Sequence, residues 1–271
     1  MPRCNHILNS MPVITLTSDF GLNDYYLAAA KGSILREIPQ ATLVDIAHDL
    51  PHHDLMKAGY ILRNCFRYFP EGSIHIVGID SIESESKIHV AMKAEGHYFI
   101  GADTGVFSLI LKSHADEIVQ LNLDKQWAGT TFPMLRVFAP AACHLARGGT
   151  LQVIGRLIGG YKKLILPAPP RGESYLGGVI QHVDSYGNLI TNIDRETFES
   201  YGRNTRFSIL LRKNQYGVSR ISKNYHDAAE GELAAFFNHE GNLEIALNRG
   251  SASRLLGLKL FDNLRIEFYA D

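Results

Sequence analysis

Two hydrophobic patterns divide this chain of 271 residues. Up to about residue 165, apolar runs typical of strands alternate with segments whose apolar residues recur at helical spacing. That order predicts an α/β N-terminal domain with a mostly parallel sheet and helices on both of its faces. Beyond residue 174 the apolar runs are short and separated by turn residues, which predicts a smaller all-β C-terminal domain, a barrel or a sandwich.

The two patterns also predict the boundaries of the domains and their elements. The α/β domain is expected at residues 12–165 and the all-β domain at 174–271, with a proline-rich linker at 166–173. The expected strands of the first domain are 13–16, 42–46, 73–79, 87–92 and 98–100. Its expected helices are 26–38, 55–69, 105–113 and 138–147. Expected strands of the second are 178–183, 189–193, 207–211, 233–237, 243–246 and 264–268, with a helix at 195–201.

Composition narrows the classes of function. Because 27 basic and 28 acidic residues are mixed along the chain, it lacks the basic stripe that nucleic-acid binding needs. Cys4, Cys65 and Cys143 lie far apart and form no CxxC, which argues against a disulfide framework and a thiolate zinc site. No apolar run approaches the ~18 residues of a membrane span, and the N-terminus lacks a signal-peptide core. We therefore expect a cytoplasmic protein with no nucleic-acid or membrane partner.

A carboxylate follows the first expected strand, where open α/β sheets bind ligands. Ser18 and Asp19 end the apolar run, and Gly21 and a helical segment follow. Asp19 can accept hydrogen bonds from a ribose diol, or it can simply cap the following helix. The segment is neither a GxGxxG nor a P-loop sequence, so a dinucleotide or a triphosphate is not the first expectation.

A second carboxylate, Asp80, follows the buried run 73–79, and Lys87 ends the acidic loop behind it. An Asp–Lys pair can hold a water or polarise a substrate, and it can equally be an ion pair beside a solvated loop. His89 shares a strand face with Lys87, so it too could approach Asp80. An ordinary strand histidine is the simpler interpretation.

Two other polar segments of the first domain have a structural interpretation. Residues 45–54 contain three histidines and three aspartates, but their spacing across Pro51 does not suit a metal. A polar loop entering a helix capped near His53 or Asp54 explains them better, and we expect no metal. Asp103 lies between glycines ahead of a helix, where it can bind a polar ligand or serve the turn.

Two hairpin segments of the second domain carry further polar side chains. Asp184 and Asn188 flank a tight turn that carries Tyr186. They can capture the ammonium and carboxylate of an amino-acid group, or they can stabilise the hairpin. Asn238 and Asn248 can read the edge of a base, or they can again serve a hairpin.

Taken in order, these segments resemble the S-adenosyl-L-methionine (SAM) hydroxide adenosyltransferase family, which is related to the fluorinase and chlorinase that attack the same substrate with halide. The resemblance covers nearly the whole chain. The matching residues are Ser18–Gly21, Asp24, Tyr26, Lys31–Gly32, Asp45, Ile46, His48, Pro51, Asp54, Phe69, Pro70, Gly72, Asp80, the GADTG of 101–105, Thr131–Phe132, Val137–Ala142 and Asp184–Ile193.

The resemblance implies SAM as substrate, no further cofactor, and a homotrimer whose sites lie between the α/β domain of one subunit and the β domain of another. It implies that Asp19 takes the ribose hydroxyls and that Asp184 and Asn188 hold the methionine end. The other residues expected to bind the substrate are Ser18, Tyr26, Asp103, Phe132, Tyr186, Asn238 and Asn248. In hydrolytic members, a water held by an Asp–Arg–His set attacks C5′ of the ribose and releases adenosine and L-methionine.

The sequence departs from the family where that water is held. Asp80 is retained, but Lys87 stands where the family has arginine and Pro133 where it has histidine. Lysine offers a point charge in place of a planar fork, and proline cannot act as a base. Two functions fit this pattern. One is a SAM hydrolase with Asp80 and Lys87 as catalytic residues, and the other is a catalytically silent protein that binds SAM or adenosine.

Overall fold

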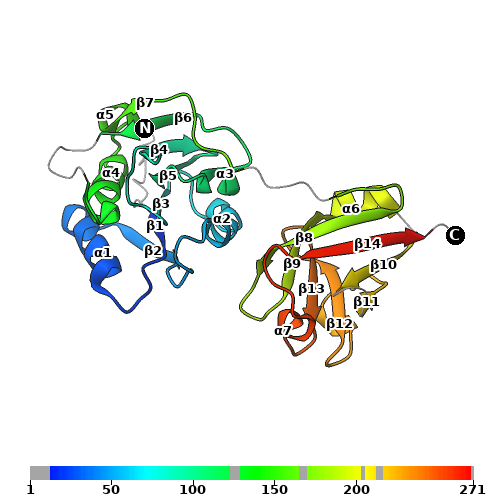
Figure 1. Ribbon diagram of the computed structural model, residues 1–271. Helices are drawn as coiled ribbons and strands as arrows, with labels where there is room; N and C mark the ends of the chain where they lie inside the picture. The colour runs from blue at the N-terminus through cyan, green and yellow to red at the C-terminus, as the bar shows by residue number, and fades with distance from the viewer. Residues whose placement is uncertain (1–12, 123–128, 165–169, 203–204, 212–215, 270–271) are drawn as a thin grey trace, which may run out of the picture. The chain divides into compact units, whose positions relative to one another are not determined.

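The computed structural model describes residues 13–122, 129–164, 170–202, 205–211 and 216–269 (Figure 1). The chain forms two compact units, Met1–Ile165 and Leu166–Asp271, and each is described by itself. No helix in the described ranges is both long and apolar enough to cross a membrane.

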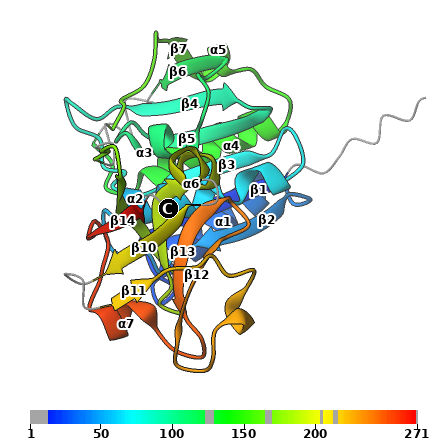
Figure 2. The ribbon, with the colours of Figure 1, turned by 90° about the vertical axis from the view of Figure 1, so that its right-hand side faces the viewer.

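The first unit is built on a mixed seven-stranded sheet of order β2-β1-β3-β5-β4-β6-β7 (Figure 2). The four strands β2, β1, β3 and β5 run parallel, and β4, β6 and β7 continue the sheet by antiparallel pairing. The α/β prediction is therefore confirmed, with an antiparallel edge that it did not include. The strands are β1 (Val13–Ser18), β2 (Thr42–Ala47), β3 (Ile74–Gly78), β4 (His89–Ala94), β5 (His97–Ala102), β6 (Glu117–Leu121) and β7 (Gly155–Leu157).

Helices cover both faces of this sheet because alternate strand residues are apolar on each side. Ile14, Leu16 and Ile76 pack with α1 and α4, whereas Val77 and Phe99 pack with α2 and α3. The expected helix 55–69 divides into α2 and the short 3₁₀ helix η1. The helices are α1 (Tyr25–Glu37), α2 (Leu55–Arg63), η1 (Phe66–Tyr68), α3 (Val106–Ile110), the π-helix η3 (Met134–Phe138), α4 (Ala139–Ala146) and α5 (Leu151–Ile154).

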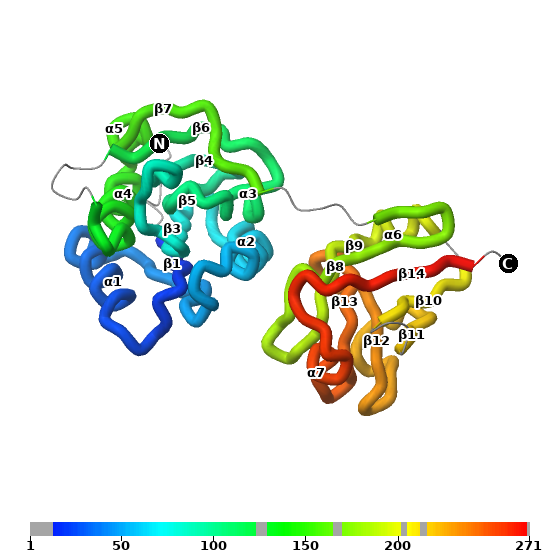
Figure 3. The backbone as a smooth tube through the Cα atoms, in the orientation of Figure 1, coloured from blue at the N-terminus to red at the C-terminus, as the bar shows by residue number. Residues whose placement is uncertain are grey.

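The second unit is an all-antiparallel, nearly closed barrel of order β11-β10-β14-β8-β9-β13-β12, which confirms the all-β prediction. The last strand, β14, lies between β8 and β10, as the trace in Figure 3 shows. Its elements are β8 (Tyr175–Val183), β9 (Leu189–Asp194), α6 (Arg195–Gly202), β10 (Arg206–Leu211), β11 (Tyr216–Val218), η4 (Tyr225–Asp227), β12 (Leu233–Phe237), β13 (Asn242–Leu247), α7 (Ala252–Leu256) and β14 (Asn263–Tyr269).

A buried histidine in β3 is expected to make the stability of the first unit depend on pH. His75 has no exposed surface, and its ring contacts Thr15 Oγ1 at 2.8 Å and His97 Nδ1 at 3.3 Å. Burial, followed by the neighbouring His97, lowers the pKa of His75 from 6.5 to about 3. The stability that neutral His75 contributes is therefore fully present above about pH 6.5 and is lost as the pH falls toward 3.

Between pH 7.5 and pH 5, this titration is expected to remove on the order of 2 kcal/mol from the free energy of unfolding. Urea unfolding of the wild type and of His75→Gln at both pH values measures it, because glutamine keeps an amide near Thr15 but does not titrate. The variant should lose about 2 kcal/mol less than the wild type. The same change at the exposed His52 is the control; equal losses in the wild type and in His75→Gln would contradict the assignment.

Candidate functional site

The carboxyl ends of β1 and β3 bring two carboxylates to one edge of the first sheet. The two strands are parallel neighbours, with Ser18 opposite Gly78, so Asp19 and Asp80 follow at the same edge. Asp19 is buried, and its Oδ2 accepts a hydrogen bond from the main-chain N–H of His53 at 2.9 Å. Its carboxylate therefore holds the loop that leads from β2 into α2.

Asp80 lies in a cluster with two groups that can carry positive charge. Lys87 Nζ lies 2.7 Å from Asp80 Oδ1, and Nδ1 of His53 lies 3.3 Å from the same oxygen. The expected Asp80–Lys87 contact is thus present, whereas His89 does not join it. Nε2 of His89 contacts the carbonyl oxygen of Ser81 at 2.8 Å, and the ring is fully buried beside Phe138.

The loop between β2 and α2 is ordered by a chain of side-chain contacts. Ser18 Oγ contacts His48 Nδ1 at 2.7 Å, His48 Nε2 contacts Asp45 Oδ1 at 3.0 Å, and Lys31 Nζ donates to Asp45 Oδ2 at 2.6 Å. Burial lowers the pKa of His48. Ser18, which the resemblance assigns to the substrate, therefore has its hydroxyl engaged by a histidine.

The last residue of the histidine-rich segment caps α2. Asp54 Oδ1 accepts from the main-chain N–H of Lys57 at 2.9 Å, the cap expected from the sequence. In the described ranges no group of three or more His, Cys, Asp or Glu residues could hold a metal ion.

Aromatic rings form an apolar wall next to Asp19. Phe20 and Tyr26 lie 5.8 Å apart, and Phe132 lies 5.8 Å from Phe20 and 5.1 Å from Tyr26. Pro133 follows Phe132 and is the N-cap of η3, whose buried Met134 packs against Gly78: a Cβ atom at Gly78 would lie 3.2 Å from Met134 Sδ. The segment with Pro133 therefore lies against the end of β3 but brings no ionisable side chain from positions 132–134.

Asp103 has a structural partner. Its Oδ1 and Oδ2 accept from the main-chain N–H of Lys162 at 2.8 and 3.1 Å, and burial raises the pKa of its carboxyl. These bonds hold the segment that leaves the first unit, which favours the structural interpretation of Asp103.

In the second unit, Asp184 builds the turn between β8 and β9. Its Oδ1 accepts from the main-chain N–H groups of Tyr186 and Asn188, each at 2.9 Å, and its Oδ2 accepts from Asn188 Nδ2 at 2.9 Å. Gly187 has φ +85°, and a Cβ there would lie 2.0 Å from Ser251 Oγ, so glycine is required. Asp184 therefore orients both Tyr186 and Asn188.

Replacing Asp184 by alanine is expected to destabilise the second unit by about 2–3 kcal/mol, because three hydrogen bonds to one carboxylate are lost. Asp184→Asn keeps an oxygen for the two main-chain donors and should cost about 1 kcal/mol. Urea unfolding followed by circular dichroism measures both variants. Equal stability of the wild type and Asp184→Ala would show that the carboxylate does not hold the turn.

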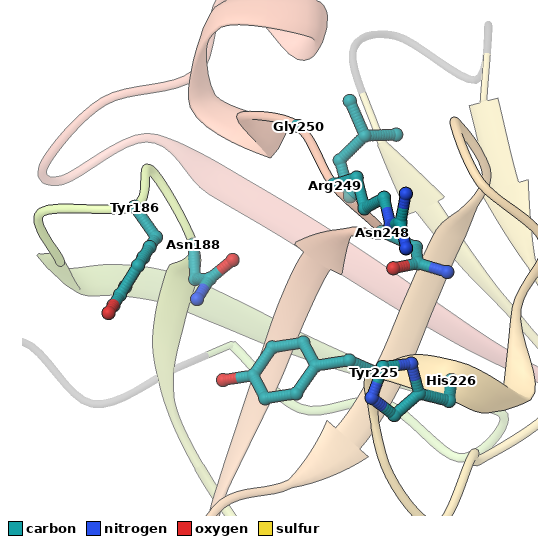
Figure 4. A pocket seen from close by; sticks show the side chains of 8 residues that line it. Tyr186, Asn188, Tyr225, His226, Asn248, Arg249 and Gly250 are labelled. Atoms are coloured by element: carbon teal, nitrogen blue, oxygen red, sulfur yellow. The ribbon is translucent and has the colours of Figure 1, made fainter.

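This turn borders a cavity of about 580 Å³ within the second unit. Figure 4 shows Tyr186 and Asn188 on one side of it and Asn248 and Arg249 on the other, with Tyr225 between them. The lining residues are Tyr186, Asn188, Tyr225, His226, Leu247, Asn248, Arg249 and Gly250. Three residues expected from the sequence to bind the substrate are thus brought together, and Tyr225, His226 and Arg249 were missed because no motif marks them.

A buried carboxylate supports this cavity. Glu244 accepts hydrogen bonds from Tyr225 Oη at 2.8 Å and from Asn238 Nδ2 at 3.2 Å, and burial raises the pKa of its carboxyl. Oδ1 of Asn238 accepts from the main-chain N–H groups of Glu240 and Asn242, so this asparagine orders the β12–β13 hairpin. Nδ2 of Asn248 donates to the carbonyl oxygen of Ala228 at 2.8 Å.

Each of the two units matches the model of a known domain family. Residues 14–155 match the model of the SAM hydroxide adenosyltransferase N-terminal domain, and residues 178–265 match that of the C-terminal domain.

Comparison with individual proteins extends over most of the chain. An (R)-S-adenosyl-L-methionine hydrolase of Methanocaldococcus jannaschii is 28% identical over 94% of this chain and 96% of its own length. The enzyme of that name from Thermus thermophilus is 30% identical over 92% and 97%. A fluorinase of Actinopolyspora mzabensis is 25% identical over 95% and 97%. A crystal structure of a conserved Thermotoga maritima protein has a TM-score of 0.84 at 28% identity, covering 94% of this chain and 99% of that one.

Proposed function

Because this chain belongs to the SAM hydroxide adenosyltransferase family, we propose that it is a SAM hydrolase that forms adenosine and L-methionine. The observation that carries the proposal is the Asp80–Lys87 pair at the sheet edge where the buried Asp19 also lies. Relatives named (R)-S-adenosyl-L-methionine hydrolase, at 28–30% identity, support the choice of water as the nucleophile.

The reaction requires no covalent bond between the protein and the substrate. The oxygen of water forms a bond to C5′ of the ribose while the C5′–S bond breaks, and its electron pair stays on sulfur as neutral methionine. One proton is released from the water. The sulfonium is already a good leaving group, so the protein contributes mainly by aligning the water and partly removing bulk solvent.

We assign the first-unit residues by what each can offer. Asp19 accepts hydrogen bonds from the ribose hydroxyls, and Phe20, Tyr26 and Phe132 supply an apolar wall for the nucleoside. Asp80, with Lys87 balancing its charge, holds the water. Ser18 acts through His48, and Asp103 through the main chain of Lys162.

We assign the cavity of the second unit to the two ends of SAM, the amino-acid group and the base. Asn188, oriented by Asp184, offers amide groups to the amino-acid end, and Tyr186 covers it. Asn248 reads the base edge, and Asn238 acts indirectly by supporting Glu244. As the resemblance implies, the working form in this proposal is a homotrimer with sites shared between subunits.

The test is incubation of the purified protein with (R)- and (S)-SAM in water enriched in ¹⁸O. Release of adenosine and methionine in equal amounts, with ¹⁸O in the 5′-hydroxyl of adenosine, is the expected result. A no-protein control corrects for spontaneous breakdown of SAM. Absence of enzyme-dependent adenosine would contradict the proposal, and transfer to another nucleophile would appear as an adenosyl product without the label.

A second function is favoured by the departures from the family's water site. With Pro133 and Lys87 in place of histidine and arginine, the chain could bind SAM or adenosine without turnover. Tight calorimetric binding of adenosine, together with no release of methionine from SAM, would establish that function in place of hydrolysis.

A further inference from the structure

One residue connects the two carboxylates at the edge of the first sheet. His53 donates its main-chain N–H to Asp19 Oδ2 at 2.9 Å, and its ring Nδ1 lies 3.3 Å from Asp80 Oδ1. In the proposed function, Asp19 binds the ribose hydroxyls and Asp80 holds the attacking water. His53 therefore lies where the reacting carbon and the attacking water would meet.

Both residues of the His53–Asp80 contact have an unusual backbone conformation. His53 has φ 62° and Asp80 has φ 44°, so two non-glycine residues in contact both adopt the left-handed region. A non-glycine residue in this region is strained, and such strain persists where the surroundings impose it, often at functional sites. The Asp19 bond to the His53 N–H and the Leu55 N–H bond to the His53 carbonyl, both 2.9 Å, impose it here.

The ring of His53 is free to act on a bound ligand. Its side chain is 72% exposed, so contact with Asp80 on one side leaves the rest of the imidazole open. His89 cannot take this role because it is buried against Phe138 and contacts Ser81. Residues 132–134 offer no ionisable group.

We propose that His53 is the catalytic base of the hydrolysis. In this role Asp80, whose Oδ1 lies 3.3 Å from Nδ1, favours the tautomer with its proton on Nδ1, which leaves Nε2 as the acceptor. As the water oxygen bonds to C5′ and the C5′–S electron pair moves to sulfur, Nε2 takes the proton from water and later releases it to solvent. This inference rests on the proposed hydrolysis, and it places the imidazole on the β2–α2 loop at a position that no sequence motif indicated.

Two variants test the role of the ring without disturbing the backbone. Asparagine adopts the left-handed region more readily than most residues, and glycine adopts it freely, so His53→Asn and His53→Gly should keep φ and the N–H bond to Asp19. His52→Asn is the matched control, since that neighbour is exposed and the Asp80 contact is made by His53.

In His53→Asn, kcat for adenosine release is expected to fall about 100-fold or more. The KM for SAM and the calorimetric Kd for adenosine should stay close to the wild type, because Asp19 is untouched. His52→Asn should turn over normally, and added imidazole should restore part of the rate of His53→Gly but not of Asp80→Asn.

The outcomes separate this proposal from the one on which it rests. A wild type that releases adenosine while His53→Asn does so equally fast would overturn the role of His53 and leave the hydrolase in place. An equal loss of adenosine affinity and turnover would show that His53 acts only by holding the loop. A wild type without turnover would overturn both proposals.

Discussion

Asp80→Asn is expected to slow the release of adenosine from SAM by at least about 100-fold at saturating substrate. The variant keeps the size of the side chain and tolerates the left-handed φ of 44°. It removes the charge that pairs with both Lys87 and His53 through one oxygen. A water held by this cluster would lose the charged oxygen that accepts its hydrogen bond, and His53 would lose the charge that orients its ring.

The measurement is the steady-state kcat by quantification of adenosine, with the calorimetric Kd for adenosine measured in parallel. Glu85→Gln is a matched control, because it removes one carboxylate from the exposed part of the same loop. Unchanged adenosine binding with lost turnover would assign Asp80 to the chemical step. A rate within about threefold of the wild type would show that the Asp80–Lys87 pair is only an ion pair.

Asp19→Ala is expected to weaken adenosine binding by at least about 100-fold. A carboxylate that accepts from two ribose hydroxyls contributes about 1.5–3 kcal/mol for each charge-assisted bond. Loss of about 3 kcal/mol corresponds to more than 100-fold in Kd. Asp19 is also buried, so bound nucleoside would meet it in a partly desolvated place where these bonds are stronger.

The same carboxylate holds the β2–α2 loop through the His53 N–H, so a structural control is needed. Asp19→Asn keeps an oxygen for this N–H while it weakens the interaction with the diol. Isothermal titration with adenosine should rank affinity as wild type, then Asn, then Ala, with little change in the thermal midpoint of Asp19→Asn. Equal affinity in all three would show that the ribose is bound elsewhere.

These two variants also distinguish the two candidate functions. In a hydrolase, Asp80→Asn loses turnover but not binding, and Asp19→Ala loses both. In a silent binder, Asp19→Ala alone has an effect.

Much of the fold follows from local sequence signals. The runs 73–79 and 98–100 are nearly all apolar, as strands buried on both faces must be, and β3 and β5 form there. The strands β6 and β7 were missed because they are short and, in β7, mostly exposed, so their side chains carry little of the pattern that marks a buried strand. Their antiparallel pairing makes the sheet mixed.

Some contacts of the candidate site could likewise be predicted from the sequence, and others could not. Asp80 and Lys87 lie seven residues apart around one loop, so their contact could be anticipated from the chain alone. The hairpin roles of Asp184 and Asn238 were also anticipated, because turns bond within a few residues of themselves. The set of polar side chains that lines the cavity could not be anticipated, because Tyr186 and Asn248 come from separate hairpins.

By itself, the sequence determined the two fold classes, the family, and the placing of Asp19 and Asp80 at strand ends. Each of these rests on hydrophobic periodicity or on motifs that lie within a short stretch of chain. Only the tertiary structure decided that His53 meets Asp80 and not His89, and that Ser18 is engaged by His48. Those contacts depend on how the β2–α2 loop packs over the ends of two parallel strands, and no local pattern encodes that packing.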